Sequence, residues 1–292
     1  EGVEIRLNTP VRDINSLFAE GYEAVFLAIG AHEPQRLGIE GEDAQGVYHG
    51  VPFLQAVSLA AGSGNLPTVG ERVVVIGGGN TAVDAARTAL RLGAREVAMV
   101  YRRSREEMPA SSWEIEEAER EGVRLELLTA PVAVEVKDGR VAGIKCQRME
   151  LGEPDESGRR RPVPVAGSEF VIAADTMIAA VAQAPEISFL DAGHGLEVSA
   201  KGTFGVDAKT LTTGRPGIFA GGDAHRGPGI LIEAIADGRR GALSIDRYLR
   251  GVDLLTAREE VPLPVVDLPD EEITQIVASG KADSSPRVAI PT

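Results

Sequence analysis

One segment limits the possible folds of this chain more than any other. Residues 73–84 contain an apolar run, a glycine turn and the start of an alanine-rich helix, with Gly77, Gly79 and Ala82 in the spacing G-x-G-x-x-A. In that arrangement the first glycine permits a tight turn, the second lets a pyrophosphate approach the backbone, and the alanine allows close packing of helix on strand. Phosphate groups are stabilised at such a helix N-terminus. The predicted contacts to a dinucleotide are Gly77, Gly79, Asn80, Thr81 and Ala82.

Two arginines follow the next predicted strand, and they bear on which dinucleotide binds. Residues 97–101 form an apolar run that leads directly into Arg102 and Arg103. A domain that binds NAD usually carries an acidic residue about 20 positions after the glycines, where it holds the ribose 2′-hydroxyl. Arginines at this position favour a 2′-phosphate and therefore NADP(H). The alternative is a solvated loop in which the arginines pair with Glu106 and Glu107.

The spacing of apolar runs and helix signals predicts the fold around this site. Residues 72–128 alternate between strand and helix patterns, which is typical of a doubly wound α/β domain of the Rossmann type. The second helix is expected to begin with a capping box made by Ser111 and Glu114. Residues 132–165 indicate an antiparallel insert, in which Asp138–Gly139 is typical of a hairpin turn. We therefore expect a three-layer architecture of sheet and helices, with the insert as a cap on the sheet.

A second glycine-rich segment lies near the C-terminus. Gly222 and Asp223 end a short apolar strand, and a helix is expected over residues 230–249. Asp223 is placed to accept a hydrogen bond from a ribityl hydroxyl of a flavin, although a turn or N-cap role fits the same residue type. The helix N-terminus near Gly229 and Ile230 would stabilise negative charge on a reduced flavin ring. The helix is expected to bury an apolar face made of Leu231, Ile235, Gly238, Ala242, Ile245 and Leu249.

Composition narrows the class of protein. The 292 residues are 43% hydrophobic, which is enough for two domains with separate cores. A net charge of −14 disfavours nucleic acid as a partner, because an acidic surface repels phosphates. No apolar run approaches the roughly 20 residues that span a bilayer. The four histidines are scattered without metal-ligand spacing, so no metal site is expected, and no catalytic side chain is predicted.

Cysteine usage restricts the redox chemistry. Cys146 is the single cysteine of the chain. It cannot form an internal disulfide, and one thiolate cannot hold an iron–sulfur cluster, which needs about four. Dithiol reductase chemistry is excluded for the same reason. Low cysteine usage is typical of reducing compartments, so a cytoplasmic location is expected.

These motifs, in this order, resemble the glutamate synthase small-subunit family of FAD- and NAD(P)H-dependent oxidoreductases. The matching segments are residues 24–31, 77–84, 101–109, 182–185 and 217–228. In that family the NAD(P) domain is inserted into the FAD domain. The resemblance implies that Arg102 and Arg103 hold the 2′-phosphate, that Gly222 and Asp223 line FAD, and that Gly229 and Ile230 face the flavin ring. It also places Gln183, from the matched segment 182–185, among the cofactor-binding residues.

The resemblance implies a domain plan and a function. We expect a truncated first half of an FAD-binding domain over residues 1–66, an NAD(P)H-binding domain over 67–184, the C-terminal half of the FAD domain over 185–250, and an extended arm over 251–292. The family's own glycine turn for the FAD pyrophosphate does not precede residue 1, and the chain starts at Glu1 rather than Met, so a fragment with an incomplete FAD site is expected.

The function implied is that of an electron-input module. It would pass hydride from NADPH to FAD and then electrons to iron–sulfur clusters or to a glutamate synthase-type partner subunit. The alternative is a catalytically silent NADP(H)-binding fragment or subunit that needs a partner to complete its FAD site.

Overall fold

A computed structural model describes residues 2–60, 66–155, 158–190 and 193–255, together with residues 274, 275, 278 and 279. The chain divides into one unit over residues 1–254 and a second over residues 255–292. The arm predicted over residues 251–292 lies almost wholly outside the described residues. None of the helices in the described part combines the length and the apolar character needed to cross a bilayer.

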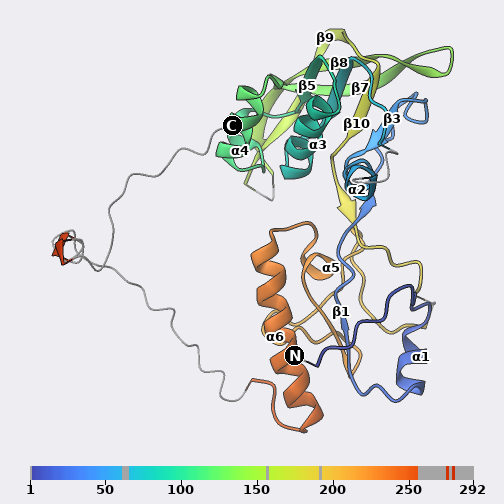
Figure 1. The fold of residues 1–292 in the computed structure, drawn as a ribbon, viewed down its shortest axis with the longest axis vertical. Coiled ribbons are helices and arrows are strands. Elements are labelled where there is room, and N and C mark those ends of the chain that lie inside the picture. The colour runs from blue at the N-terminus through green and yellow to red at the C-terminus, as the bar shows by residue number, and fades with distance from the viewer. Residues whose placement is uncertain are drawn as a thin grey trace. The chain divides into compact units, whose positions relative to one another are not determined.

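The first unit contains a five-stranded parallel sheet (Figure 1). Its strands, in spatial order, are β3 (Val47–His49), β10 (Thr176–Ala179), β4 (Arg72–Ile76), β5 (Glu96–Val100) and β6 (Arg124–Glu126). The central strands are almost continuous runs of buried apolar residues. Such runs are typical of a parallel sheet that is covered on both faces.

Helices cover one face of this sheet. They are α2 (Gly50–Ala60), α3 (Asn80–Arg91) and α4 (Ser112–Arg120). Phe53 of α2, Val83 of α3 and Ile115 of α4 are each at most 3% exposed, and they share a core with Val73 and Val97 of the sheet. Four alanines of α3 are completely or almost completely buried, which lets this helix approach the sheet closely.

An antiparallel sheet covers the other face. It is formed by β7 (Thr129–Lys137), β8 (Arg140–Pro154) and β9 (Arg160–Ala173), in that order. Ile144, Cys146 and Ile172 of this sheet pack against Val74 and Met177 of the parallel sheet. The β7–β8 hairpin turns at Asp138–Gly139, where both residues have positive φ (53° and 77°). The predicted α/β fold and its antiparallel cap are thus confirmed, and the three layers are helices, parallel sheet and antiparallel sheet.

Two local predictions need correction. The first is the domain boundary at residues 66 and 67, since β3 pairs with β10 and α2 packs against the core of the parallel sheet. Residues 47–60 therefore belong with residues 72–182. The second is the capping box at Ser111 and Glu114: Ser111 is the N-cap of α4, but its side chain makes no capping hydrogen bond. The capping box forms instead at Ser104 and Glu107, around the short 3₁₀ helix η1 (Arg105–Glu107).

The remaining elements form a second core. They are α1 (Ile14–Ala19), β1 (Val25–Leu27), β12 (Ile218–Ala220), α5 (Asp223–Arg226) and α6 (Leu231–Leu249). Strands β1 and β12 pair in parallel, and Ile14, Leu27, Phe204, Ile218 and Ala224 are buried around them.

One antiparallel bridge joins the two cores along the chain. It consists of β2 (Glu33–Pro34) paired with β11 (Gln183–Ala184). We call residues 35–182 the inserted lobe and residues 2–34 with 183–254 the terminal lobe.

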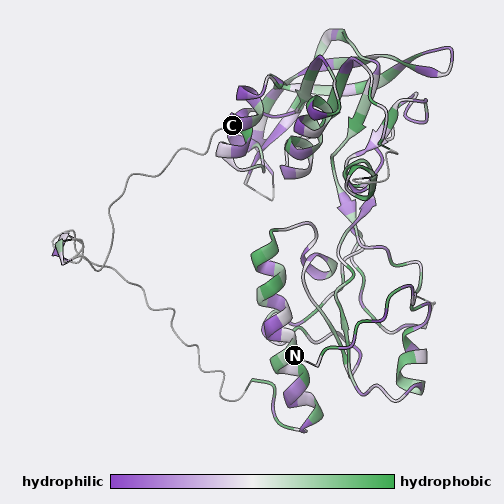
Figure 2. Cartoon of the chain, in the orientation of Figure 1, coloured by the Kyte–Doolittle hydropathy of each residue, from purple (hydrophilic) through white to green (hydrophobic). Residues whose placement is uncertain are grey.

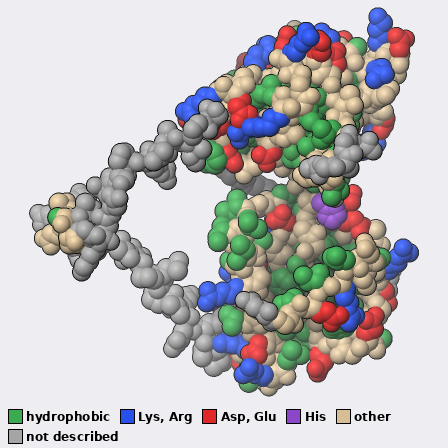
Figure 3. Space-filling view, in the orientation of Figure 1, with side chains coloured by type: hydrophobic (Ala, Val, Ile, Leu, Met, Phe, Trp, Pro, Cys, Tyr) green, Lys and Arg blue, Asp and Glu red, His purple; other side chains and the backbone are tan. Residues whose placement is uncertain are grey.

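The buried face of α6 differs from the predicted one. Asp237, Gly241 and Ser244 are buried, whereas Leu231 is 78% exposed and Ile235 is 56% exposed. The reason is close packing on β1, because a Cβ atom on Gly241 would lie 2.2 Å from the Phe26 ring. Only a stripe of small or polar side chains fits there. Hydrophobic residues remain exposed at the N-terminal end of α6 (Figures 2 and 3).

Candidate functional site

Gly77 shapes the turn between β4 and α3. Its φ of 147° lies in a region that favours glycine, and a Cβ atom at this position would lie 2.2 Å from the carbonyl oxygen of Ala180. Its backbone N–H donates to the carbonyl oxygen of Val100 at 3.0 Å. Gly78 is restricted as well, since an added Cβ would lie 2.5 Å from the Tyr101 ring. These two glycines therefore serve the packing of the turn between three strands.

Gly79 differs from both, because it faces open space. It is the N-cap of α3 with ordinary backbone angles (φ −93°, ψ 176°), and no side chain caps the helix. A Cβ atom built on Gly79 has no heavy atom within 4 Å. The first N–H groups of a helix have no acceptor within the helix. The turn at residues 77–81 thus leaves an uncapped helix N-terminus beside an empty space, which is an arrangement that binds phosphate.

Thr81 and Gln183 meet on one side of this turn. The side-chain amide of Gln183 donates from Nε2 to Oγ1 of Thr81 at 3.2 Å, although 102 positions separate the two residues. Strand β10, which leads to Gln183, pairs with β4 on the side opposite β5. The order of strands therefore reverses between β10 and β4, and ligands of open α/β sheets bind at such a switch point. Asn80 lies on the other side, where its Oδ1 accepts from the N–H of Ser111 at 3.3 Å.

Arg102 and Arg103, predicted as a pair, have different surroundings. Arg102 is exposed, and within the described residues no carboxylate pairs with it. Arg103 is 5% exposed, and its guanidinium donates to Oδ2 of Asp155 at 2.5 Å and to the carbonyl oxygen of Arg160 at 2.7 Å. Arg103 already has these two acceptors, so it is a support of the loop in this structure, whereas Arg102 is available to a ligand.

Glu107 is a buried carboxylate at the end of η1, a few residues after Arg103. It is 7% exposed and accepts from the Nε of Arg160 at 2.6 Å and from the backbone N–H of Ser104 at 3.1 Å. Hydrogen bonding by Ser104 and by Arg160 holds the pKa of Glu107 below its usual value against the effect of burial. The alternative interpretation, that Glu106 and Glu107 neutralise Arg102 and Arg103, is therefore wrong for Glu107, whose partner is Arg160. Sequence reasoning missed Asp155 and Arg160, because the hairpin that carries them is distant in sequence.

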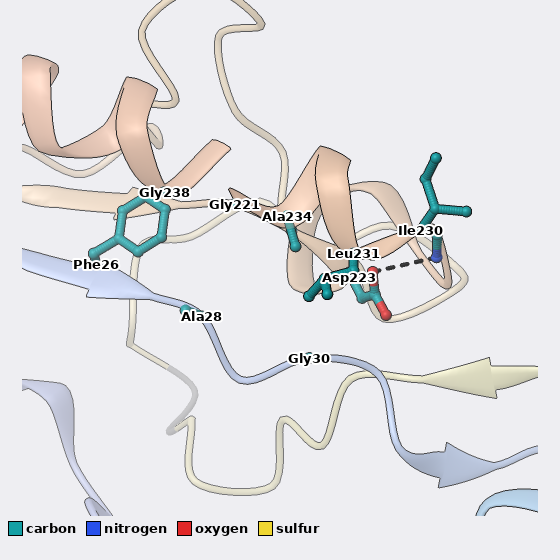
Figure 4. A pocket seen from close by; sticks show the side chains of 11 residues that line it. Phe26, Ala28, Gly30, Gly221, Asp223, Ile230, Leu231, Ala234 and Gly238 are labelled. Carbon is teal, nitrogen blue, oxygen red and sulfur yellow. Dashed lines mark hydrogen bonds between the residues drawn. The ribbon is translucent and has the colours of Figure 1, made fainter. Parts of the chain in front are cut away.

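The terminal lobe contains a cavity of about 280 Å³ between the end of β1, the Gly222–Asp223 turn and the N-terminal end of α6 (Figure 4). Gly222 has φ 61° and ψ −148°, so the turn requires glycine. Oδ1 of Asp223 accepts from the N–H of Gly229 at 3.2 Å. Burial raises the pKa of Asp223, and the negative charge of Glu233 adds to the rise. The predicted residues Gly222, Asp223, Gly229 and Ile230 are thus brought together, with the side chain of Ile230 pointing away from Ala28 and Gly30 in Figure 4.

Asp237 holds this turn from inside the lobe. It is completely buried, and its carboxylate accepts from the N–H of Gly222 at 3.0 Å and from the guanidinium of Arg226 at 2.7 and 2.8 Å. Arg240 donates to the same carboxylate at 3.2 Å. The hydrogen bond from Arg226 is the main cause that lowers the pKa of Asp237. Asp237 was not among the predicted residues, and its only signal in the sequence is an acid within a helix of small residues.

A known family matches a stretch of the chain that includes both glycine turns. The sequence profile of the pyridine nucleotide-disulphide oxidoreductase family matches residues 1–238. The chain belongs to this family. This match and the relatives described next confirm the predicted resemblance and the predicted pyridine-nucleotide oxidoreductase class.

Individual relatives are similar over most of this chain. It is 45% identical over 296 residues to the NADP(+)-dependent formate dehydrogenase subunit beta of Moorella thermoacetica. That alignment covers 99% of this chain and 41% of the relative. It is 43% identical to the glutamate synthase [NADPH] small chain of Escherichia coli (strain K12), over 85% of this chain and 55% of the relative. The chain therefore spans about half the length, or less, of these relatives.

Solved structures share the fold. The Mycobacterium tuberculosis protein FprA, in complex with NADPH, superposes with a TM-score of 0.69 at 21% identity, over 84% of this chain and 68% of that one. Thioredoxin reductase from T. acidophilum superposes with a TM-score of 0.59 at 22% identity, over 79% of this chain and 66% of that one.

Proposed function

We propose that this chain is the NADPH-binding electron-input module of a larger flavin-dependent oxidoreductase, similar to the glutamate synthase small chain. The single observation that carries the proposal is the uncapped N-terminus of α3, which opens onto free space at Gly79. This site lies at a strand switch point and near Arg102, an exposed arginine that no carboxylate among the described residues pairs with. Such a site recognises the pyrophosphate of a dinucleotide, and the arginine recognises a further phosphate on the neighbouring ribose.

In this proposal each predicted nucleotide contact has a specific task. The backbone N–H groups at Gly79, Asn80 and Thr81 receive the pyrophosphate. Arg102 receives the 2′-phosphate, with Arg103 as its support rather than as a second ligand. Gln183 and Thr81 close the other side of the turn through their mutual hydrogen bond. Binding and orientation are the contributions of these residues, and none of them acts as an acid or a base.

The residues of the terminal lobe fit one wall of a flavin site. The glycine-only turn at Gly222 lets a ligand approach the backbone, and Asp223 presents a carboxylate to hydroxyl groups. When bound there, FAD would accept the hydride of NADPH and release electrons one at a time. We include an iron–sulfur or glutamate synthase-type partner as the acceptor, since the relatives named above are subunits. A cytoplasmic location stays part of the proposal and rests on cysteine usage alone.

A second candidate function is supported by the size of the cavity. At about 280 Å³ it falls just below the roughly 300–1,000 Å³ of typical small-molecule sites, so the described residues would enclose only part of FAD. The chain would then bind NADP(H) and stay catalytically silent until a partner completed the flavin site. Dye reduction separates the two candidates. With NADPH and added FAD, the electron-input module reduces an artificial dye, and the silent module binds NADPH without doing so.

Calorimetric titration with NADPH and with NADH tests the nucleotide assignment. We expect tighter binding of NADPH, and we expect Arg102→Ala to weaken NADPH binding by about 10- to 100-fold, as for the loss of a charge-assisted contact, with NADH unchanged. Arg95→Ala is the matched control, because Arg95 is an exposed arginine at the opposite, amino-terminal edge of the sheet. Equal affinities of the wild-type chain for both nucleotides would refute the assignment, and so would an unchanged preference in Arg102→Ala.

A further inference from the structure

Two ion pairs connect the β8–β9 hairpin to residues 101–107, which we call the arginine loop. Asp155, at the tip of the hairpin, pairs with Arg103 at 2.5 Å, and Arg160, at the start of β9, pairs with Glu107 at 2.6 Å. Both partners in the loop are buried, since their side chains are 6% and 8% exposed. The backbone carbonyl of Arg160 accepts from Arg103 as well. The contacts are made across more than 50 positions of sequence.

The rest of the loop is fixed from the sheet side. The carbonyl oxygens of Tyr101 and Arg103 accept from the N–H groups of Thr129 and Leu128, at 3.0 and 3.1 Å. The hydroxyl of Tyr101 donates to the carbonyl oxygen of Glu107 at 2.7 Å. Arg102 thus lies between two residues whose backbones are anchored, and its own side chain is left exposed. The hairpin provides the only charged partners of Arg103 and Glu107 that the described residues show.

We propose that the β8–β9 hairpin is the element that sets the preference for NADPH over NADH, with Asp155 and Arg160 as positioning residues. They hold Arg103 and Glu107 inside the loop, so that Arg102 alone is presented to the 2′-phosphate. This inference rests on the proposed nucleotide function. It predicts that residues about 50 positions away from the arginines change discrimination without touching the nucleotide.

The physical reason is preorganisation. A guanidinium gains most from a phosphate when its backbone is already fixed, because less conformational entropy is lost on binding. Without the charge of Asp155, Arg103 would be a buried cation with one carbonyl acceptor, and the loop would shift to hydrate it. That shift would move Arg102. NADH lacks the 2′-phosphate, so its affinity is expected to stay the same.

The test is the ratio of dissociation constants for NADH and NADPH, measured by calorimetry on the full chain. Asp155→Asn is expected to lower this ratio by about tenfold, and Asp155→Glu is expected to restore most of it. Arg160→Gln, which removes the ion pair to Glu107 and keeps the backbone acceptor, should lower the ratio as well. Asp138→Asn is the matched control, because it removes the same charge from the other hairpin of the same sheet.

The outcomes are distinguishable. If the wild-type chain shows no preference, the proposed nucleotide assignment fails and this inference fails with it. If Arg102→Ala abolishes the preference but Asp155→Asn and Arg160→Gln leave it intact, the inference alone is overturned. If Asp155→Asn binds NADPH more tightly than the control does, Asp155 competes with phosphate for Arg103, which also contradicts a positioning role.

Discussion

Replacing Gly79 by alanine should separate the folding role of the glycine turn from its binding role. The backbone angles at Gly79 (φ −93°, ψ 176°) are accessible to alanine, and the added Cβ meets no heavy atom within 4 Å. Reduced freedom of the unfolded chain stabilises such a variant by about 0.4–1 kcal/mol. Alanine is a poorer N-cap than glycine, and this opposes the gain by a similar amount. The net change in unfolding free energy is therefore expected within about 1 kcal/mol, or a few degrees in Tm.

The same methyl group should be costly for nucleotide binding. It would project into the space that the pyrophosphate needs in order to reach the helix N–H groups. Loss of one hydrogen bond to a charged group corresponds to about 1.5–3 kcal/mol, or roughly 10- to 150-fold in Kd. NADPH and NADH should lose affinity equally, because both carry the pyrophosphate.

Gly77→Ala provides the contrasting variant. Its Cβ would lie 2.2 Å from the Ala180 carbonyl oxygen in a backbone region that disfavours alanine, so we expect destabilisation by about 3 kcal/mol or more. Differential scanning calorimetry and titration with both nucleotides measure the two effects. The reasoning is refuted if Gly79→Ala binds NADPH as the wild type does, or if Gly77→Ala unfolds at the wild-type temperature.

Two further expectations concern titratable groups. The pKa of Asp237 is lowered in the folded state, so its contribution to stability is complete above the unfolded pKa, about 3.9, and is lost as pH falls through the folded value. Asp237→Asn should therefore be less stable than the wild type at pH 7, by about 1–3 kcal/mol, and the difference should shrink in urea titrations below pH 4; a constant difference would contradict the assignment. Cys146 is completely buried and its pKa is raised to about 12, chiefly by burial, so a thiol reagent at pH 8 should label it only after unfolding. Rapid labelling of the native chain would show that this reasoning fails.

The features that sequence predicted well are local or periodic. The strand–turn–helix around Gly77 is encoded within a dozen residues, and the Asp138–Gly139 turn needs only its own two residues. The parallel strands could be found because both faces are buried, which makes them uniformly apolar.

Features that depend on contacts between distant segments were not predictable. In α6 two stripes of residues compete for the lobe, and hydrophobicity favours the wrong one. What decides is the approach of the Phe26 ring, which leaves room only for Gly241 and its neighbours. The different roles of Arg102 and Arg103 likewise depend on Asp155, 52 positions from Arg103. No local pattern indicates that pairing.

The bridge between β2 and β11 has a consequence for modularity. Glu33 pairs with Ala184, and the N–H of Gln35 donates to the carbonyl oxygen of Ala182 at 3.0 Å, so the inserted lobe begins and ends at neighbouring points. A segment whose two ends are adjacent can be removed or transplanted with little demand on its host, since a short linker can rejoin the chain on either side. Residues 35–182 can therefore be exchanged as one segment, and another protein with a pair of adjacent loop ends would be a suitable host for it.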